Sequence, residues 1–290
     1  MKLANLALVS ATILGTLAVG CTRDDDTAAA DDASLGSAES QLVEDDTEAS
    51  DLDDDLEIGL DEPLSGASEA EPGSPADGAS DDEVLEAVRS NAGRFFAPAG
   101  CVTSTRDGDR ITHVFAGCTG PYGMTTFDGT VVSTYAREPG KLTVTHRTDG
   151  FEANGATIAG TRVVTYTRDG STVTKSRTGS WTGTTAKGNP IGHDASFVTT
   201  YDASTKCLTR DGSAQTSIGA RSFERTVDGY RRCGVGRGGC PESGTIVLSR
   251  TKDGASLSLT LAFPGGPRLR VTRPNGREVT RLLVCRPNAT

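Results

Sequence analysis

The sequence predicts an all-β fold: an antiparallel meander of long hairpins, either sandwich-like or one open curved sheet, preceded by one short helix and a disordered acidic tether. Three observations support this prediction. After Phe95, runs of β-branched residues alternate with polar ones, and no helical period competes with them. Asp-Gly and Asn-Gly pairs punctuate these runs. Acidic residues, in contrast, are concentrated in the segment that precedes the runs.

Residues 1–20 form a predicted export signal. Lys2 supplies a positive charge, and the apolar stretch that follows is too short to span a bilayer comfortably. The stretch ends in Leu17-Ala18-Val19-Gly20-Cys21, which resembles the signal of bacterial lipoproteins, although Ala18 stands where that pattern usually has Leu. The resemblance implies cleavage before Cys21, acylation of its sulfur and anchoring in a membrane of the cell envelope. The alternative is an ordinary secretory signal in which Cys21 is incidental.

The residue after the cysteine bears on the membrane that is reached. Thr22, not Asp, follows Cys21. In lipoproteins generally this favours the outer membrane, so we expect an exported protein that is lipid-anchored to the outer membrane of a bacterial cell envelope.

Residues 21–80 form a predicted disordered acidic linker. Thr22 to Glu83 contains 23 acidic residues and one basic residue, whereas Val84 to Thr290 contains 16 acidic and 27 basic residues. A segment so acidic, with almost no aromatic residues, cannot bury enough apolar surface to offset its chain entropy. We therefore expect a solvated stalk. The alternative is an acidic arm that binds cations or folds back on the basic domain.

Residues 81–93 form the predicted short helix. Ser80 and Glu83 have the spacing of a capping box, in which each residue satisfies a backbone N–H of the other. A small apolar stripe follows at Val84, Leu85 and Val88. We expect this helix to pack against the first strands.

Residues 94–290 form the predicted β domain. Thr, Ser and Arg occupy most alternate positions in its strands, which predicts one face for a core and one for water. Trp181 is expected to anchor the core or its rim, and the alternative is a platform for a ligand. Tight turns with positive φ are expected at Asp-Gly and Asn-Gly pairs. These pairs stand at 107–108, 128–129, 149–150, 154–155, 169–170, 211–212, 228–229, 253–254 and 275–276.

Six cysteines remain when Cys21 is set aside, and an even number in an exported domain favours disulfides. Six cysteines allow 15 pairings. From their places relative to the predicted hairpins we favour Cys101–Cys118, Cys207–Cys233 and Cys240–Cys285. A zinc site is not expected, because no cysteines stand two apart and the three histidines are scattered.

Motifs for catalysis are not found, and we expect neither an enzyme nor a cofactor. The chain lacks a G-x-S-x-G elbow and an H-E-x-x-H sequence. His113 and His146 fall in strand patterns, where an exposed or hydrogen-bonded residue is expected. Gly234 to Gly239 formally fits G-x-G-x-x-G, but it lies between two cysteines and is followed by Pro241 rather than by a helix.

The basic character of the domain is the remaining candidate for function. Arginines gather in two stretches, and a stripe of them on one strand face could bind an anionic ligand. The alternative is a solvated face, or one that meets the acidic tether. Nucleic acid is not expected as a partner, because the chain is exported and lacks interleaved aromatic residues. The first stretch holds Arg221, Arg225, Arg231, Arg232 and Arg237, and the second, which we single out as a possible anionic-ligand surface, holds Arg268, Arg270, Arg273, Arg277 and Arg281.

Three segments of the domain stand out: Asn154-Gly155 with 158–165, 173–183 around Trp181, and 240–247 with a cysteine near the C-terminus. Together they resemble a pattern found in exported, β-rich bacterial lipoproteins. The resemblance covers roughly residues 150–290, and its motifs are turns, a tryptophan and cysteines. It implies a fold and a location but no activity.

Taken as a sequence, the chain is expected to be a lipid-anchored cell-envelope protein with a non-catalytic binding or structural β domain. The membrane, through the acyl anchor, and an anionic envelope polysaccharide or another surface protein are the expected partners. Alternatives are a carrier of an amphiphile on an apolar sheet face and, less favoured, a hydrolase without a sequence motif.

Overall fold

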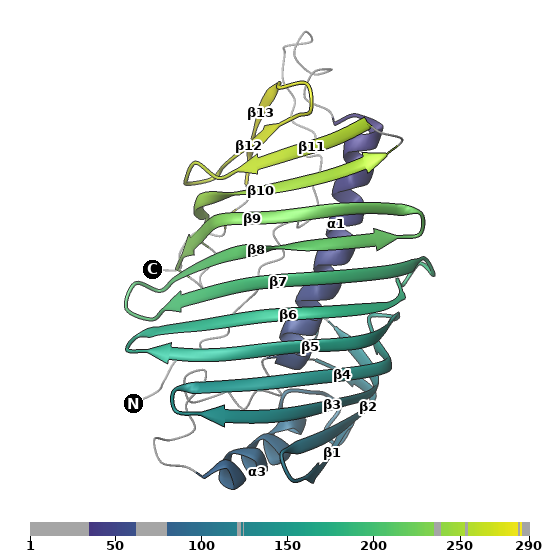
Figure 1. Cartoon of the computed structure of the whole chain (residues 1–290), viewed down its shortest axis with the longest axis vertical. Coiled ribbons are helices and arrows are strands. Elements are labelled where there is room, and N and C mark those ends of the chain that lie inside the picture. The colour runs from purple at the N-terminus through teal and green to yellow at the C-terminus, as the bar shows by residue number, and fades with distance from the viewer. Residues whose placement is uncertain are drawn as a thin grey trace.

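One antiparallel sheet of 13 strands forms the protein, with the helix α1 lying across one face of it (Figure 1). The computed structural model describes residues 35–61, 80–120, 123, 125–234, 239–252, 255–283 and 285. Strand order follows chain order from β1 to β13, so each strand pairs with the strands before and after it in sequence. Among the described residues, neither helix has the combination of length and apolar character that crossing a membrane requires.

The helical elements are α1 (Ser37–Leu56), the π-helical turn η1 (Glu57–Asp61), α3 (Asp81–Asn91) and the 3-10 turn η2 (Ala92–Arg94). The strands are β1 (Val102–Asp107), β2 (Arg110–Thr119), β3 (Thr126–Glu138), β4 (Lys141–Ala153), β5 (Ala156–Asp169), β6 (Thr172–Thr184), β7 (Pro190–Asp202), β8 (Cys207–Ile218), β9 (Arg221–Cys233), β10 (Pro241–Lys252), β11 (Ala255–Ala262), β12 (Arg268–Thr272) and β13 (Glu278–Leu282).

The predicted all-β meander of long hairpins is confirmed, and of the two arrangements that the sequence allowed it is the single open sheet. Strands β3 to β10 are 12 to 14 residues long, about twice the usual length of a strand. Long strands leave the chain with few turns, which is why some of the predicted turns are not turns.

The Asp-Gly and Asn-Gly pairs divide into turns and bulges. Asn154-Gly155 joins β4 to β5, with φ angles of 50° and 79°, as predicted. The pairs at 128–129, 149–150, 211–212 and 228–229 instead lie inside strands, where the prediction of hairpin turns is wrong. The ladder between β3 and β4 shifts register beside Gly129 and Gly150, which are both at positive φ. A β-bulge of the glycine-containing G1 type takes the same positive φ as a tight turn, so the local sequence does not distinguish the two.

The two faces of the sheet differ sharply. In the long strands the buried residues mostly recur at every second position and lie on one face, which we call the core face. Trp181 is 5% exposed there, as expected for a core residue. The opposite face, the open face, carries mainly Thr and Ser at partly or fully exposed positions. The sequence predicted this division.

The core face is covered by α1, and this corrects the predicted disordered linker. Within residues 21–80, the segment 37–61 is helical and buries Leu42, Leu52, Leu56 and Leu60 against the sheet. The prediction of disorder is wrong for this segment, because its carboxylates are neutralised by basic side chains of the sheet. The arm that folds back on the basic domain, the alternative left open by the sequence, is the arrangement found. The predicted signal 1–20 and Cys21 lie outside the described residues.

The second helix, α3, follows the prediction closely. The Ser80 hydroxyl accepts a hydrogen bond from the Glu83 N–H at 3.3 Å, and the Glu83 carboxylate accepts one from the Ser80 N–H at 2.8 Å. Leu85 and Val88 pack in a second apolar cluster with side chains of β2 to β5. The helix therefore covers the β1 end of the sheet, where Figure 1 places it.

Candidate functional site

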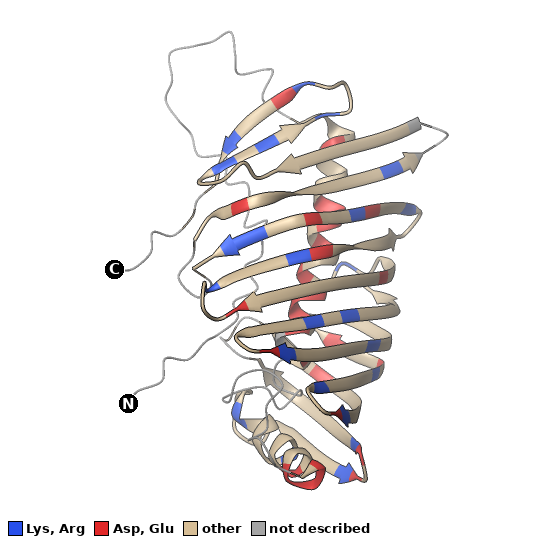
Figure 2. Ribbon diagram, turned by 60° about the vertical axis from the view of Figure 1, so that its left-hand side comes forward, with Lys and Arg blue, Asp and Glu red and all other residues tan. Residues whose placement is uncertain are grey.

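The most distinctive surface of the protein is the contact between an acidic helix and a basic sheet face. We call residues Ser37–Asp61, which form α1 and η1, the acidic strap. The strap runs across successive strands, and Figure 2 shows its red acidic segments behind the strands that carry blue basic ones. The basic side chains that meet the strap form the cationic face: Arg162, Lys175, Arg177, Arg210, Arg221, Arg225, Arg250 and Arg273.

A repeat in the strap generates the centre of this contact. Leu52-Asp53, Leu56-Glu57 and Leu60-Asp61 place a leucine followed by an acid every four residues. Side chains four residues apart lie on the same side of a helix. All three leucines and all three acids are buried, so each repeat adds one apolar and one anionic contact to the same face.

The three acids and three cations form a closed network. Arg162 Nη1 donates to Asp53 Oδ1 at 2.9 Å, and its Nη2 donates to Asp61 Oδ2 at 2.8 Å. Lys175 Nζ donates to Glu57 Oε1 at 2.8 Å. Arg177 donates to both Glu57 and Asp53. Each carboxylate therefore meets at least two cations, which is how so many charges can be buried together.

The strap acids have pKa values that reflect this network. Burial raises the pKa of Asp53, but Arg177 and Arg162 outweigh it and hold the pKa below its usual range. For Glu57 the same balance is set by Lys175 and Arg177, and its pKa is also lowered. All three central carboxylates, including Asp61, thus remain ionised at neutral pH.

Farther along the strap, ion pairs continue toward the β12 end. Arg221 Nε donates to Asp45 Oδ2 at 2.8 Å, and Arg225 Nη1 lies 3.6 Å from Asp46 Oδ2. Near the start of the strap, Glu39 accepts a hydrogen bond from Arg273 Nη2 at 2.7 Å. The ion pairs thus extend over the whole length of the helix.

Three histidines lie on the core face, sealed from solvent. His113 Nδ1 shares a hydrogen bond with the Ser104 hydroxyl at 2.8 Å, and His146 Nδ1 shares one with the Ser133 hydroxyl at 2.9 Å. Each serine lies on the strand next to its histidine. Burial lowers the pKa of His113 to about 3 and that of His146 to about 4. Both are hydrogen-bonded, as expected, but neither is exposed: they are 0% and 1% exposed.

His193, the third histidine, and His146 both lie close to carboxylates of the strap. His193 Nδ1 shares a hydrogen bond with the Thr216 hydroxyl at 2.9 Å, and Trp181 stacks on its ring. Its Nε2 lies 4.0 Å from Asp53 Oδ1, and His146 Nε2 lies 3.9 Å from Asp61 Oδ1. Burial lowers the pKa of His193, so all three rings are neutral at pH 7.

A small cavity lies between the strap and β7 to β9. It has a volume of about 20 Å³. Asp46, His193, Arg210 and Arg225 line it, and each contributes a buried atom without a hydrogen bond among the described residues. Such a volume matches one water molecule. This cavity therefore has no room for an organic ligand.

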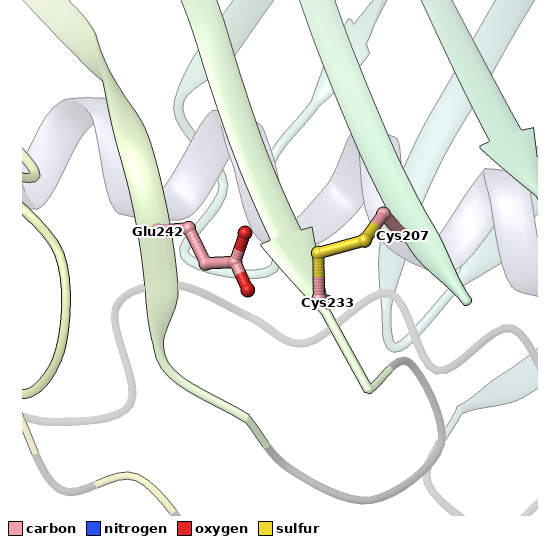
Figure 3. A group of neighbouring side chains, drawn as sticks. All are labelled: Cys207, Cys233 and Glu242. Atoms are coloured by element: carbon pink, nitrogen blue, oxygen red, sulfur yellow. A yellow bond between two sulfur atoms is a disulfide. The ribbon is translucent and has the colours of Figure 1, made fainter. Parts of the chain in front are cut away.

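All three predicted disulfides are confirmed: Cys101–Cys118, Cys207–Cys233 and Cys240–Cys285. Glu242 lies beside the Cys207–Cys233 bridge, and Figure 3 shows the three side chains together. The two sulfurs and a Glu242 carboxylate oxygen all lie within 4.8 Å of one another, as the ligands of a metal ion would. The two sulfurs are bonded to each other, however, whereas a metal ligand must be a thiolate. Glu242 instead lies 3.4 Å from Arg231.

The five arginines predicted as an anionic-ligand surface do not share one face. Arg268 and Arg270 are exposed on the open face of β12. Arg281 pairs with Leu269 in the ladder, so it belongs to the opposite face. Arg273 pairs with Glu39 of the strap, and Arg277 follows the β12–β13 turn. The predicted stripe therefore reduces to Arg268 and Arg270, because side chains of a strand alternate between faces.

The basic residues that matter most for the contact were missed by the sequence analysis. Arg162, Lys175 and Arg177 stand at the same parity as the buried Val164, Tyr166 and Val173. Charged residues at core parity are the signal that could have revealed a buried counter-charge.

No protein-family model matches the chain, and neither a curated protein nor a solved structure matches it.

Proposed function

We propose that the chain is an exported, lipid-anchored cell-envelope protein whose sheet binds an anionic envelope polysaccharide without catalysing a reaction. The observation that carries this proposal is the contrast between the two sheet faces. The core face is covered by the acidic strap and, toward the β1 end, by α3, so the open face is the large surface that the fold presents to a partner.

Export and anchoring are supported by the sequence and by the disulfides. The Leu17–Cys21 segment resembles a lipoprotein signal. Three disulfides are typical of proteins that leave the reducing cytoplasm. Together they favour acylation at Cys21 and a domain that faces the oxidising envelope.

The open face has the chemistry of a glycan-binding surface. Strand pairing aligns Thr145, Val163, Thr178, Ser196 and Ser213 in one row across five strands. Neighbouring rows place hydroxyls close together, with Thr143 Oγ1 3.2 Å from Thr165 Oγ1. Hydroxyls both donate and accept hydrogen bonds, as sugar hydroxyls do.

Two cations supply the preference for an anionic polysaccharide. Arg268 and Arg270 project from the open face of β12, beyond the hydroxyl rows. Arg270 Nε lies 3.7 Å from Glu278 Oε2 in an exposed pair. An exposed pair of this kind is weak, so a carboxylate or sulfate of a polymer can compete for the guanidinium.

A non-catalytic role is supported by the position of the histidines. His113, His146 and His193 are at most 4% exposed, and the Nε2 atoms of His146 and His193 lie 3.9 and 4.0 Å from strap carboxylates. A substrate cannot reach a general base in such a position while α1 is docked. The same burial weighs against an amphiphile carrier, because the apolar face that would hold the amphiphile is covered by the strap leucines.

Intact mass of the membrane-extracted protein tests the anchor. We expect the mass of residues 21–290 plus acyl chains, with a gain of six hydrogens on reduction of the three disulfides. A mass without lipid that starts at another residue would contradict the lipoprotein proposal.

Retention on columns of an immobilised acidic polysaccharide tests the open face. Thr178→Glu and Arg270→Glu each place a negative charge on that face and should reduce retention at least several-fold. Ala186→Glu, in the exposed turn between β6 and β7, is the matched control and should bind like the unaltered protein. Equal retention of all three variants would refute the open face as the binding surface.

A further inference from the structure

We infer that the cationic face also binds the acidic strap of a second copy of this chain, so that two copies exchange straps. This goes beyond the proposed function, and it does not depend on the lipid anchor or on the polysaccharide. It follows from what the face requires of an occupant, from the identity of the two straps, and from the length of chain that follows the strap.

The face requires an occupant that is both acidic and apolar. Arg162, Lys175 and Arg177 are buried and need carboxylates. Between them, aromatic and aliphatic side chains of the core face need apolar cover, which Leu52, Leu56 and Leu60 provide. A polysaccharide or a nucleic acid supplies anions but no leucines. An occupant must therefore be an acidic helix with an acid-and-leucine pair at every fourth residue.

A second copy supplies such a helix with every contact intact. In an exchanged pair, Asp53, Glu57 and Asp61 of one copy would meet the cations of the other in the same geometry as within one chain. No buried charge would lose its partner, so exchange has little net cost once both straps have moved. Exchange of an identical element is the lowest-cost route to a dimer.

The chain between the strap and the sheet is long enough to allow this. Residues 62–79 separate Asp61 from Ser80, and 18 extended residues span at most about 60 Å. The strap helix of 20 residues is only about 30 Å long. The covalent connection therefore does not decide which sheet a strap covers.

The concentration of the protein instead determines which sheet a strap covers. A linker of 18 residues gives the strap of the same chain an effective concentration on the order of millimolar. Dilute protein should accordingly keep its own strap, and exchange should appear when copies are crowded, as they would be on a membrane surface. This dependence on concentration gives the proposal its test.

One exposed ion pair reports on strap position without any mutation. Lys187 Nζ, in the β6–β7 turn, lies 3.4 Å from Glu48 Oε2 of the strap. A carbodiimide activates a carboxylate, which the amine then attacks to form an amide. The full chain is prepared with natural nitrogen and with ¹⁵N, and the two preparations are mixed and incubated at rising concentration. After cross-linking, mass spectrometry shows whether the linked Lys187 and Glu48 peptides carry the same label.

Strap exchange predicts mixed-label Lys187–Glu48 links that increase with concentration toward half of all such links. The local pair Lys141–Glu138, 3.3 Å apart within one hairpin, is the internal control and should stay unmixed. Glu48→Gln should abolish the link and confirm its assignment. Links that form in good yield but stay unmixed at the highest concentration would overturn the proposal. So would mixed links from Lys187 to carboxylates outside the strap at the same frequency, because they would report collision alone.

Discussion

Asp61 ends the acidic strap with its carboxylate 2.8 Å from the guanidinium of Arg162, a residue 101 positions later in the chain. Both side chains are almost completely buried. A carboxylate in that position must be matched by cations, or the strap could not lie on the sheet. This pair is representative of the contact between the strap and the cationic face. Predictions about that contact test whether the strap is part of the fold.

Removing a central strap charge should destabilise the protein strongly. Asp53→Asn leaves Arg162 and Arg177 short of a partner in a buried site. Breaking one side of a buried ion pair costs about 3–5 kcal/mol, and the free energy of unfolding in urea should fall by that amount. Asp82→Asn is the matched control, since its carboxylate is 86% exposed, and it should cost less than about 1 kcal/mol. Equal effects of the two variants would mean that the strap contributes nothing to stability.

Stability should fall as the pH is lowered from 6.5 toward 4. His113 and His146 have pKa values of about 3 and about 4 in the folded protein, below the ordinary value of 6.5. In this window the unfolded chain binds more protons than the folded one, so acid favours unfolding. Two such groups give a slope of up to about 2.7 kcal/mol per pH unit. Urea titrations at several pH values measure it, and the double variant His113→Gln/His146→Gln should flatten the curve.

Asp54 should act in the opposite direction. Burial raises its pKa to about 6, above the ordinary 3.8. Between pH 6 and 3.8 the folded protein therefore binds this proton more tightly, and the carboxyl opposes the destabilisation by the histidines. Asp54→Asn should steepen the loss of stability in the same titrations. A shallower loss in that variant would show that the sign of the shift is wrong.

Loss of a disulfide should destabilise the domain, and somewhat more when the bridge closes a longer loop. The bridges Cys101–Cys118 and Cys240–Cys285 join residues 17 and 45 positions apart. Paired Cys→Ser replacements at either bridge should cost about 2–5 kcal/mol, with the larger cost at the longer loop. Thermal unfolding under non-reducing conditions measures both. Two variants as stable as the unaltered protein would contradict this expectation.

Close packing between β5 and β6 should make one glycine irreplaceable. A Cβ at Gly183 would lie 1.8 Å from the Thr157 carbonyl oxygen, so the two backbones would have to separate. Gly183→Ala should therefore lower stability by about 1–3 kcal/mol or more. Gly93→Ala is the control, because the nearest atom to its Cβ would be 4.0 Å away. Similar melting temperatures for the two variants would rule out a close approach at Gly183.

The sequence predicted those features that depend on local chemistry. The capping box at Ser80 and Glu83, the turn at Asn154-Gly155 and the pairs Cys101–Cys118 and Cys207–Cys233 are each set by a few residues near in sequence or in adjacent strands. Alternation of Thr and Val predicted the core and open faces for the same reason. The Asp-Gly pairs within strands were wrongly predicted to be turns, because this dipeptide suits a bulge as well as a turn.

The strap was missed because its order depends on distant residues. Composition alone predicts disorder for residues 37–61, and the helix is stabilised by arginines and a lysine more than 100 positions later. The Leu-acid repeat at 52–61 carried a signal, as did Arg162 and Arg177 at core parity. Either signal alone predicts buried charges without a partner. Only the two together predict that the acids of the repeat neutralise the arginines of the sheet.

The length of the strap also matches the width of the part of the sheet that it crosses. Its ion pairs run from Asp61, at β5 and β6, to Glu39, beside the end of β12. The helical distance between those residues is about 33 Å, and seven strand intervals measure about 34 Å. One strand is thus matched by roughly three residues of helix. Because a meander lengthens by whole hairpins, a longer or shorter relative of this sheet should gain or lose about six or seven strap residues with each hairpin.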